Sequence, residues 1–177
     1  LTTSQALHLF AGRMPQRVGN RHPLSTPFGC YATRDGQVVI AVLNARQFAS
    51  LARLVGAPEA ADDPRFASDE SRTEHEPAVK AMIENWSQGL TTDQAVAALS
   101  AAGLPGAPIW DIAQAASNEH AAVRGLVSEL PHPRLGSAPV VGQPVRFDGE
   151  KPVASVSAPA LGADRAAILA DLGIEGE

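Results

Sequence analysis

Apolar residues recur at helical spacing through the middle of the chain. The most regular set stands at positions i, i+3, i+4 and i+7 and comprises Val79, Met82, Ile83 and Trp86. Residues at this spacing share one face of an α-helix and can pack together against a core. Pro77 fits the first turn of such a helix, because a proline there has no N–H to leave unpaired. The pattern therefore predicts an amphipathic helix that begins near Pro77.

Capping residues mark the starts of two further helices. Asn44 and Thr91 each precede a run of periodic apolar residues, and each is followed three positions later by a glutamine. In this arrangement the first side chain accepts a hydrogen bond from a free backbone N–H of the first turn. Gly56 suits the left-handed position just after the first of these helices. Shorter helices are predicted at residues 1–13, 68–75, within 110–125 with Asp111 or Ser117 as a cap, and at 164–172.

A β-hairpin is predicted ahead of these helices. Two apolar runs, residues 30–33 and 38–43, flank the turn Arg34-Asp35-Gly36. Asp-Gly between apolar runs indicates a hairpin, because glycine adopts a positive φ without steric cost. After residue 126, prolines separate short β-prone pieces at 126–130, 139–141 and 145–147, which predicts an extended arm rather than a self-contained core. The expected fold class is α+β: a small, mostly helical domain with a short antiparallel sheet and extended linker arms.

Composition narrows the class of protein. The chain has 177 residues, of which 45% are apolar and 19% charged, so a globular core is expected. Its net charge of −5 and the lack of a Lys/Arg run argue against nucleic acid or an anionic membrane as a general partner. No apolar run is long enough to predict a membrane span. This charge balance does not exclude a local basic site for a phosphorylated cofactor.

Cysteine and histidine usage excludes some kinds of site. Cys30 is the single cysteine, which rules out a disulfide framework or a thiolate zinc site within the chain. It is expected to be a small buried residue in the hairpin. Three of the five histidines, His75, His120 and His132, lack metal-ligand spacing, and no metal site is expected. We expect a reducing, cytoplasmic compartment, although a secreted protein without disulfides has the same composition.

A series of short motifs occurs in a fixed order over nearly the whole chain, and the set resembles a known family. The motifs are Gly19-Asn-Arg-His-Pro23, Tyr31-x-x-x-Asp35-Gly36, Asn44-Ala-Arg-Gln-Phe48, Asp63-Pro-Arg-Phe66, Trp86 before the Thr-Thr capped helix, Gly103-Leu-Pro105, and the closing Leu161-Gly162 and Leu172-Gly173. Each motif alone is common, whereas the ordered set is fairly specific. It resembles the C-terminal half of class III CoA-transferases, the formyl-CoA transferase and carnitine-CoA transferase (CaiB/BaiF) group.

The resemblance implies an architecture larger than this chain. Family members have an N-terminal, Rossmann-like large domain that binds coenzyme A, and two subunits interlock as a homodimer. Residues 1–28 would be the end of a helix and the linker from that domain, 29–111 the small α+β domain, and 112–177 the return linker and C-terminal arm. The start Leu1-Thr-Thr-Ser-Gln, without an initiator Met, also suggests part of a longer chain. Without the large domain or a second copy, Val127, Val141 and Phe147 are expected to be uncovered.

The resemblance also implies a reaction. Family members move CoA from an acyl-CoA to a carboxylic acid through an aspartyl-CoA thioester, and the nucleophilic aspartate lies in the large domain. The aspartates of this chain do not match its motif, so no catalytic residue is expected here and the chain alone should be inactive. Two alternatives stay open: an α-methylacyl-CoA racemase-like isomerase of the same fold, and a non-catalytic docking or dimerisation module.

One candidate substrate loop follows from the resemblance. In formyl-CoA transferase a mobile, glycine-rich loop after Gly-Asn closes over the thioester, and the aligned segment here is Pro23-Leu24-Ser25, directly after His22. Its glycines are absent, and Pro23 and Pro27 are expected to stiffen it, which argues against lid motion of that kind. The backbone N–H groups of Leu24 and Ser25 are candidates to face a carboxylate substrate.

Several side chains have both a functional and a structural interpretation. His22 is either a donor to a substrate carboxylate or a structural loop histidine. Asn44 either faces the active site, near where related racemases place an acid, or caps its helix, and the cap is favoured because it needs no substrate. The lack of an acid there also speaks against a racemase, which needs proton-transfer groups. For Arg13, Arg17 and Arg21, a solvated linker face is favoured over contacts with CoA phosphates.

Overall fold

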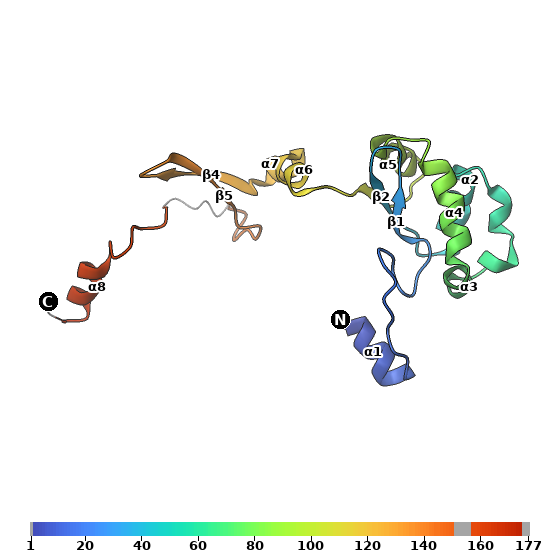
Figure 1. The fold of residues 1–177 in the computed structure, drawn as a ribbon, viewed down its shortest axis with the longest axis horizontal. Helices are drawn as coiled ribbons and strands as arrows, with labels where there is room; N and C mark the ends of the chain where they lie inside the picture. Colours follow the sequence, from blue (N-terminus) through green and yellow to red (C-terminus); the bar gives the residue numbers. More distant parts are fainter. Residues whose placement is uncertain (1, 151–156, 175–177) are drawn as a thin grey trace. The chain divides into compact units, whose positions relative to one another are not determined.

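The chain divides into two units in the computed structural model, which describes residues 2–150 and 157–174. Unit 1 covers Leu1–Ile109 and unit 2 covers Trp110–Glu177. Helices and small antiparallel sheets occur together, which confirms the predicted α+β class (Figure 1). Each unit is described by itself.

The sheet of unit 1 contains three antiparallel strands in the order β1-β2-β3. The predicted hairpin is confirmed as β1 (Phe28–Ala32) and β2 (Gln37–Ala41), with Cys30 opposite Val39. The third strand, β3 (Gly106–Pro108), was not predicted, because Pro105, Gly106 and Pro108 are residue types that interrupt helices and strands. Its proline lacks an N–H and lies at the edge of the sheet, where no partner needs that donor.

The helices of unit 1 follow one another along the chain in the predicted order, and α4 and α5 contact the sheet. Ser68 and Thr91 each form a reciprocal capping box, and Asn44 caps its helix, as the spacing indicated for the latter two. Two short 3₁₀ helices, η1 and η2, were not predicted as such. The elements are α1 (Thr2–Ala11), α2 (Ala45–Leu54), η1 (Pro58–Ala61), η2 (Pro64–Phe66), α3 (Asp69–Glu74), α4 (Glu76–Ser87) and α5 (Thr92–Ala101).

The core lies between the sheet and α2, α4 and α5. From the predicted amphipathic helix α4, Val79 and Ile83 are fully buried, while Met82 and Trp86 pack at the margin. Close packing shows most clearly at Gly106 of β3, where an added Cβ would lie 2.5 Å from Leu99 Cδ1. The buried apolar residues of this core are Tyr31, Val38, Ile40, Val42, Phe48, Leu51, Ala52, Ala60, Phe66, Val79, Ile83, Ala95, Leu99 and Leu104.

Polar side chains tie the hairpin to the helices. The carboxylate of Asp35, in the hairpin turn, accepts from the backbone N–H of Thr92 at 2.8 Å and from its hydroxyl at 2.9 Å. These hydrogen bonds lower the pKa of Asp35. At the end of β1, Glu84 accepts from the N–H of Ala32 at 3.1 Å, and Ser87 donates to its carbonyl at 2.6 Å. The turn and the strand end are therefore held by α5 and α4.

Unit 2 consists of short elements with little buried apolar surface. Asp111 caps its first helix as predicted, but the second helix is capped by Asn118 and not by Ser117. The Asn118 side-chain oxygen accepts from the N–H of Ala121, whereas the Ser117 hydroxyl donates back to Ala113 O at 2.8 Å within the preceding helix. The elements are α6 (Ile112–Ser117), α7 (Glu119–Arg124), β4 (Val127–His132), β5 (Gly136–Val141) and α8 (Arg165–Asp171).

The predicted β-prone pieces have different outcomes. The first two became the antiparallel pair β4 and β5, with Glu129 opposite Pro139. The third did not become a strand, since Phe147 forms only an isolated bridge to Glu150. Val127, Val141 and Phe147 are 45%, 90% and 67% exposed, so these side chains are uncovered as expected. Across residues 2–150 and 157–174, no helix has the length and apolar character needed to cross a bilayer.

Tyr31, the single tyrosine, provides a pH-dependent test of this fold. Burial, and then the Glu76 and Glu84 carboxylates, raise the pKa of Tyr31 far above its ordinary value. An unfolded tyrosine ionises near pH ~10, so above that pH the folded state retains a proton that the unfolded state loses, and the free energy of unfolding falls as pH rises. Tyr31→Phe should remove this part of the pH dependence.

The measurement combines tyrosinate absorbance with denaturant unfolding at a series of pH values. We expect the tyrosinate signal to appear together with unfolding. Ionisation near pH ~10 in a chain that is still folded would contradict the burial of Tyr31.

Candidate functional site

The candidate site is built where the linker before the hairpin runs along β1. Cys30 N–H donates to Asn20 O at 3.0 Å, and His22 N–H donates to Phe28 O at 2.7 Å. Gly29 makes this close approach possible, because a Cβ at Gly29 would lie 3.0 Å from both Arg21 Cβ and Asn20 O. The linker therefore extends the sheet for a short stretch beside β1, and Arg21 pairs with Gly29 there.

The His22 ring has a defined position and tautomer. It stacks on Phe28 with 5.1 Å between ring centroids and an interplanar angle of 11°. Its Nδ1 accepts a hydrogen bond from the backbone N–H of Leu24 at 3.2 Å. An accepting Nδ1 carries no proton, so in the neutral ring the proton lies on Nε2. His22 thus retains Nε2–H as its donor, and the Leu24 N–H is already bound to the ring rather than available to a substrate.

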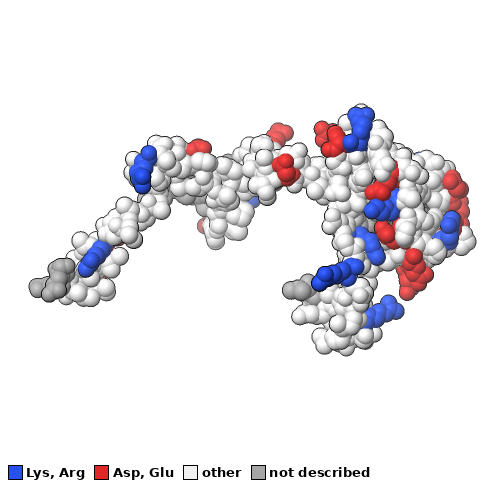
Figure 2. All heavy atoms as spheres, in the orientation of Figure 1, with Lys and Arg blue, Asp and Glu red and all other residues white. Residues whose placement is uncertain are grey.

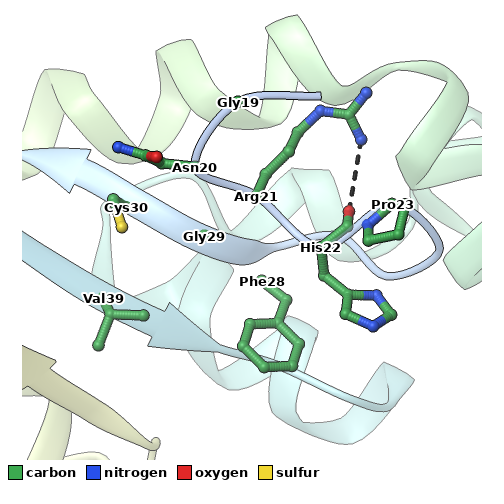
Figure 3. Close-up of a pocket in the computed structure, with 9 residues that line it drawn as sticks. All are labelled: Gly19, Asn20, Arg21, His22, Pro23, Phe28, Gly29, Cys30 and Val39. Carbon is green, nitrogen blue, oxygen red and sulfur yellow. Dashed lines mark hydrogen bonds between the residues drawn. The ribbon is translucent and has the colours of Figure 1, made fainter. Parts of the chain in front are cut away.

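A hollow of about 380 Å³ opens beside this histidine (Figure 3). A second hollow of about 220 Å³ shares part of this wall and is also lined by Val18, Tyr31, Glu76 and Lys80. Of the predicted loop, His22 and Pro23 line the first hollow. The first hollow is lined by Gly19, Asn20, Arg21, His22, Pro23, Phe28, Gly29, Cys30 and Val39.

The rest of the predicted loop lies toward α3. Pro23 and Leu24 line a third hollow of about 460 Å³, together with Arg13 and the side chains of Asp69, Glu70, Thr73 and Glu74. Ser25 is half-buried and is not among the described lining residues of these three hollows. The structure therefore groups His22 with the hairpin and Leu24 with α3, and Pro23 lines both hollows.

Asn44 occupies the helix cap that sequence analysis favoured. Its side-chain oxygen accepts from Gln47 N–H at 2.9 Å, and the Gln47 side chain in turn accepts from Leu43 N–H at 2.9 Å. Asn44 is not among the described lining residues of the three hollows. The cap accounts for this residue, and the geometry does not bring it to the candidate site.

Cys30 and the linker arginines differ in part from expectation. The prediction that Cys30 is buried was wrong, because the residue is partly exposed and lines the hollow beside His22. Arg21 donates to His22 O at 3.4 Å, Arg13 lines the third hollow, and Arg17 is exposed. On the face drawn in Figure 2, basic and acidic side chains are interspersed over unit 1.

Arg72 is the residue that sequence reasoning missed. It is 1% exposed and donates to Thr26 O at 2.7 Å, to Phe66 O at 3.0 Å and to Asp69 at 3.2 Å. The polar segment Asp69–Glu74 gave no apolar period that could mark a buried face. Among the described residues, no group of three or more His, Cys, Asp or Glu is arranged to hold a metal ion.

With this geometry in view, comparison with known proteins defines the family. Residues 1–165 match the family CoA-transferase family III. The chain therefore belongs to CoA-transferase family III, as the ordered motifs predicted.

Relatives and solved structures agree with this assignment. The chain is 32% identical over 158 residues to the acetyl-CoA:oxalate CoA-transferase of Acetobacter aceti, which covers 89% of this chain and 39% of that protein. It is 30% identical to the succinyl-CoA–D-citramalate CoA-transferase of Chloroflexus aurantiacus, over 91% of this chain and 40% of that protein. A CaiB/BaiF family structure from Brucella suis has a TM-score of 0.77 at 29% identity, over 96% of this chain and 44% of that one. The chain thus spans about two fifths of these relatives.

Gly29→Ala tests whether the linker must approach β1 this closely. The added methyl group would press on the backbone of Asn20 and Arg21, so we expect the free energy of unfolding to fall by about 1–3 kcal/mol. Gly89→Ala is the matched control, because its Cβ would lie at an ordinary 3.6 Å from Trp86 O. Denaturant unfolding and amide exchange at Cys30 measure the two effects. Equal behaviour of both variants would show that the linker does not need Gly29.

Proposed function

We propose that this chain is the C-terminal part of a CoA-transferase that moves CoA between carboxylic acids. The observation that carries the proposal is membership of CoA-transferase family III over residues 1–165. The relatives in Acetobacter aceti and Chloroflexus aurantiacus are named for a CoA thioester and a carboxylic acid. On this proposal CoA enters and leaves as part of the substrates, and the intact protein takes an acyl-CoA donor and a carboxylate acceptor.

The proposed reaction proceeds through an aspartyl-CoA thioester. The aspartate carboxylate attacks the donor thioester carbonyl, and the CoA thiolate leaves, which gives a mixed anhydride. The thiolate then attacks the aspartyl carbonyl and releases the donor acid as its carboxylate. The acceptor carboxylate opens the resulting aspartyl thioester to a second anhydride, and CoA thiolate takes the acceptor acyl group and restores the aspartate. The sequence of steps needs no oxidant or reductant.

The nucleophilic aspartate is proposed to lie outside this chain. The aspartates of unit 1 that have resolved roles hold structure: Asp35 binds Thr92, Asp63 caps η2 and binds Arg65, and Asp69 binds Arg72. None of the described residues that line the hollow beside His22 is an aspartate. These observations support the proposal that this chain forms one wall of the pocket and that the nucleophile comes from other polypeptide.

His22 is the side chain of this wall that we propose to meet the substrate. Its Nδ1 is occupied by Leu24 N–H and its ring is stacked on Phe28, so Nε2–H is held in place as a single donor. A fixed donor beside a thioester or carboxylate stabilises negative charge that develops on oxygen. Arg21 lines the same hollow, and its guanidinium donates to His22 O at 3.4 Å.

Uncovered apolar side chains support contact with further polypeptide. Helix α1 has no buried residue, and its Leu9 and Phe10 are 74% and 90% exposed. In unit 2, Val141 is 90% exposed. Surfaces of this kind are expected to be covered by another part of the protein. We propose that the N-terminal large domain and a second, interlocked subunit of a homodimer cover them.

A trapping experiment tests the reaction. The full-length protein that contains this chain is incubated with an acyl-CoA and a carboxylate acceptor, then treated with hydroxylamine and analysed by mass spectrometry. We expect transfer of CoA and an aspartyl hydroxamate outside this chain. Exchange of the α-proton without a trapped acyl-enzyme would indicate a racemase instead. Turnover by a purified 18.4 kDa chain with no companion would place the nucleophile inside it and contradict the proposal.

Substitution of His22 tests its proposed role in the full-length protein. His22→Ala removes the donor, and loss of a hydrogen bond to a charged group predicts a fall in kcat/KM of roughly tenfold to a hundredfold. His22→Gln keeps a side-chain N–H and should recover part of the loss. His120→Ala, an exposed histidine of α7, is the control. Unchanged kcat/KM in folded His22→Ala would show that His22 is a structural loop residue.

A further inference from the structure

Arg72 is a fully buried cation that the proposed reaction does not use. A guanidinium taken out of water is unfavourable unless hydrogen bonds and opposite charge compensate it. Here it contacts oxygens of Thr26, Phe66 and Asp69, and its guanidinium carbon lies 4.9 Å from the centre of the Phe48 ring. The side chain comes from α3, so one cation joins α3 to three other segments of unit 1.

The contact with Thr26 reaches the loop that carries His22. Arg72 holds the carbonyl of Thr26, and Asp69 accepts from the N–H of the same residue at 3.1 Å. The Thr73 hydroxyl donates to the Thr26 hydroxyl at 3.2 Å. Thr26 is 2% exposed. The backbone N–H, the carbonyl and the hydroxyl of Thr26 are therefore each hydrogen-bonded to a side chain of α3.

The other end of the loop is held by the sheet. His22 N–H donates to Phe28 O of β1. Pro27, the residue before Phe28, accepts from Val42 N–H through its carbonyl oxygen at 2.9 Å. Between these two anchorages lies Pro23-Leu24-Ser25, whose Leu24 N–H fixes the His22 ring. A shift of Thr26 would move this segment, and with it the hydrogen bond that sets the tautomer of His22.

We propose that Arg72 is a positioning residue of the acyl-transfer site, which clamps Thr26 so that the Leu24 N–H holds His22 with Nε2–H directed to the substrate. This inference rests on the proposed function of His22. Arginine suits the role because its planar fork donates in several directions and stacks on an aromatic ring at once, whereas lysine offers a single ammonium point charge.

The test uses Arg72→Lys and Asp69→Ala in the full-length protein. The second variant removes both the acceptor for Thr26 N–H and the carboxylate partner of Arg72. Because the Asp69 side chain is 36% exposed, water can reach the vacated position, and the Ser68 cap is kept, so this variant serves as the second test if Arg72→Lys fails to fold. Arg65→Lys is the matched control, since Arg65 pairs with Asp63 on the neighbouring η2 but is 58% exposed. We measure amide exchange of residues 20–28, thiol reactivity of Cys30, and kcat and KM separately.

We expect faster exchange of residues 20–28 in both test variants and about a tenfold fall in kcat with a smaller change in KM, while Arg65→Lys matches the wild type. In a His22→Ala background the same substitutions should cost no further kcat, because a positioning residue acts through the residue it positions. If kcat fell by the same factor in the wild-type and His22→Ala backgrounds, the proposal would be overturned and Arg72 would have a purely structural role.

Amide exchange of residues 20–28 tests the clamp independently of the proposed reaction. If exchange rises as expected but the full-length protein transfers no CoA, the reaction assignment fails while the clamp on the loop is confirmed. Unchanged exchange in a folded Arg72→Lys or Asp69→Ala protein would overturn the clamp, whatever the activity.

Discussion

The packing of unit 1 depends on one buried guanidinium. Arg72 is compensated by a carboxylate, two backbone carbonyls and the face of Phe48, and these partners come from α3, η2, α2 and the loop before β1. A buried charge requires all of its partners, because the loss of one leaves desolvated charge without compensation. The same contacts that satisfy Arg72 therefore fix the mutual positions of these segments.

The sheet depends on the helices in the same way. Three strands of three to five residues are too short to be stable alone. Their inward side chains, such as Val38 and Ile40, are fully buried against α2, α4 and α5. At the rim, Asp35 binds the start of α5, and Glu84 and Ser87 of α4 bind the end of β1. The sheet and the helices behind the His22 hollow are thus held together by both apolar and polar contacts.

The candidate site is open because of where the linker runs. Asn20 to His22 extend the sheet beside β1, and this path leaves Cys30 and the His22 ring at the surface of the hollow. The side chain of Asp69 is bound to Arg72 and Thr26, so the acid nearest the loop is engaged in structure. This arrangement is consistent with the proposal that the chain contributes one wall of a pocket, and the chain spans about two fifths of its relatives.

Sequence alone determined the hairpin, the capped helices and the family, because these depend on local signals: Asp-Gly at a turn, Asn44 and Thr91 at helix starts, and the spacing of Val79 to Trp86. It also brought His22 forward as a candidate. Tertiary structure decided the third strand, the exposure of Cys30 and the role of Arg72. The physical reason is that each of these depends on partners from other segments of the chain. Gly106 pairs with β2, Cys30 shares the wall of a hollow with Asn20 and His22 of the linker, and the Arg72 guanidinium donates to the carbonyl of Thr26 in the loop before β1.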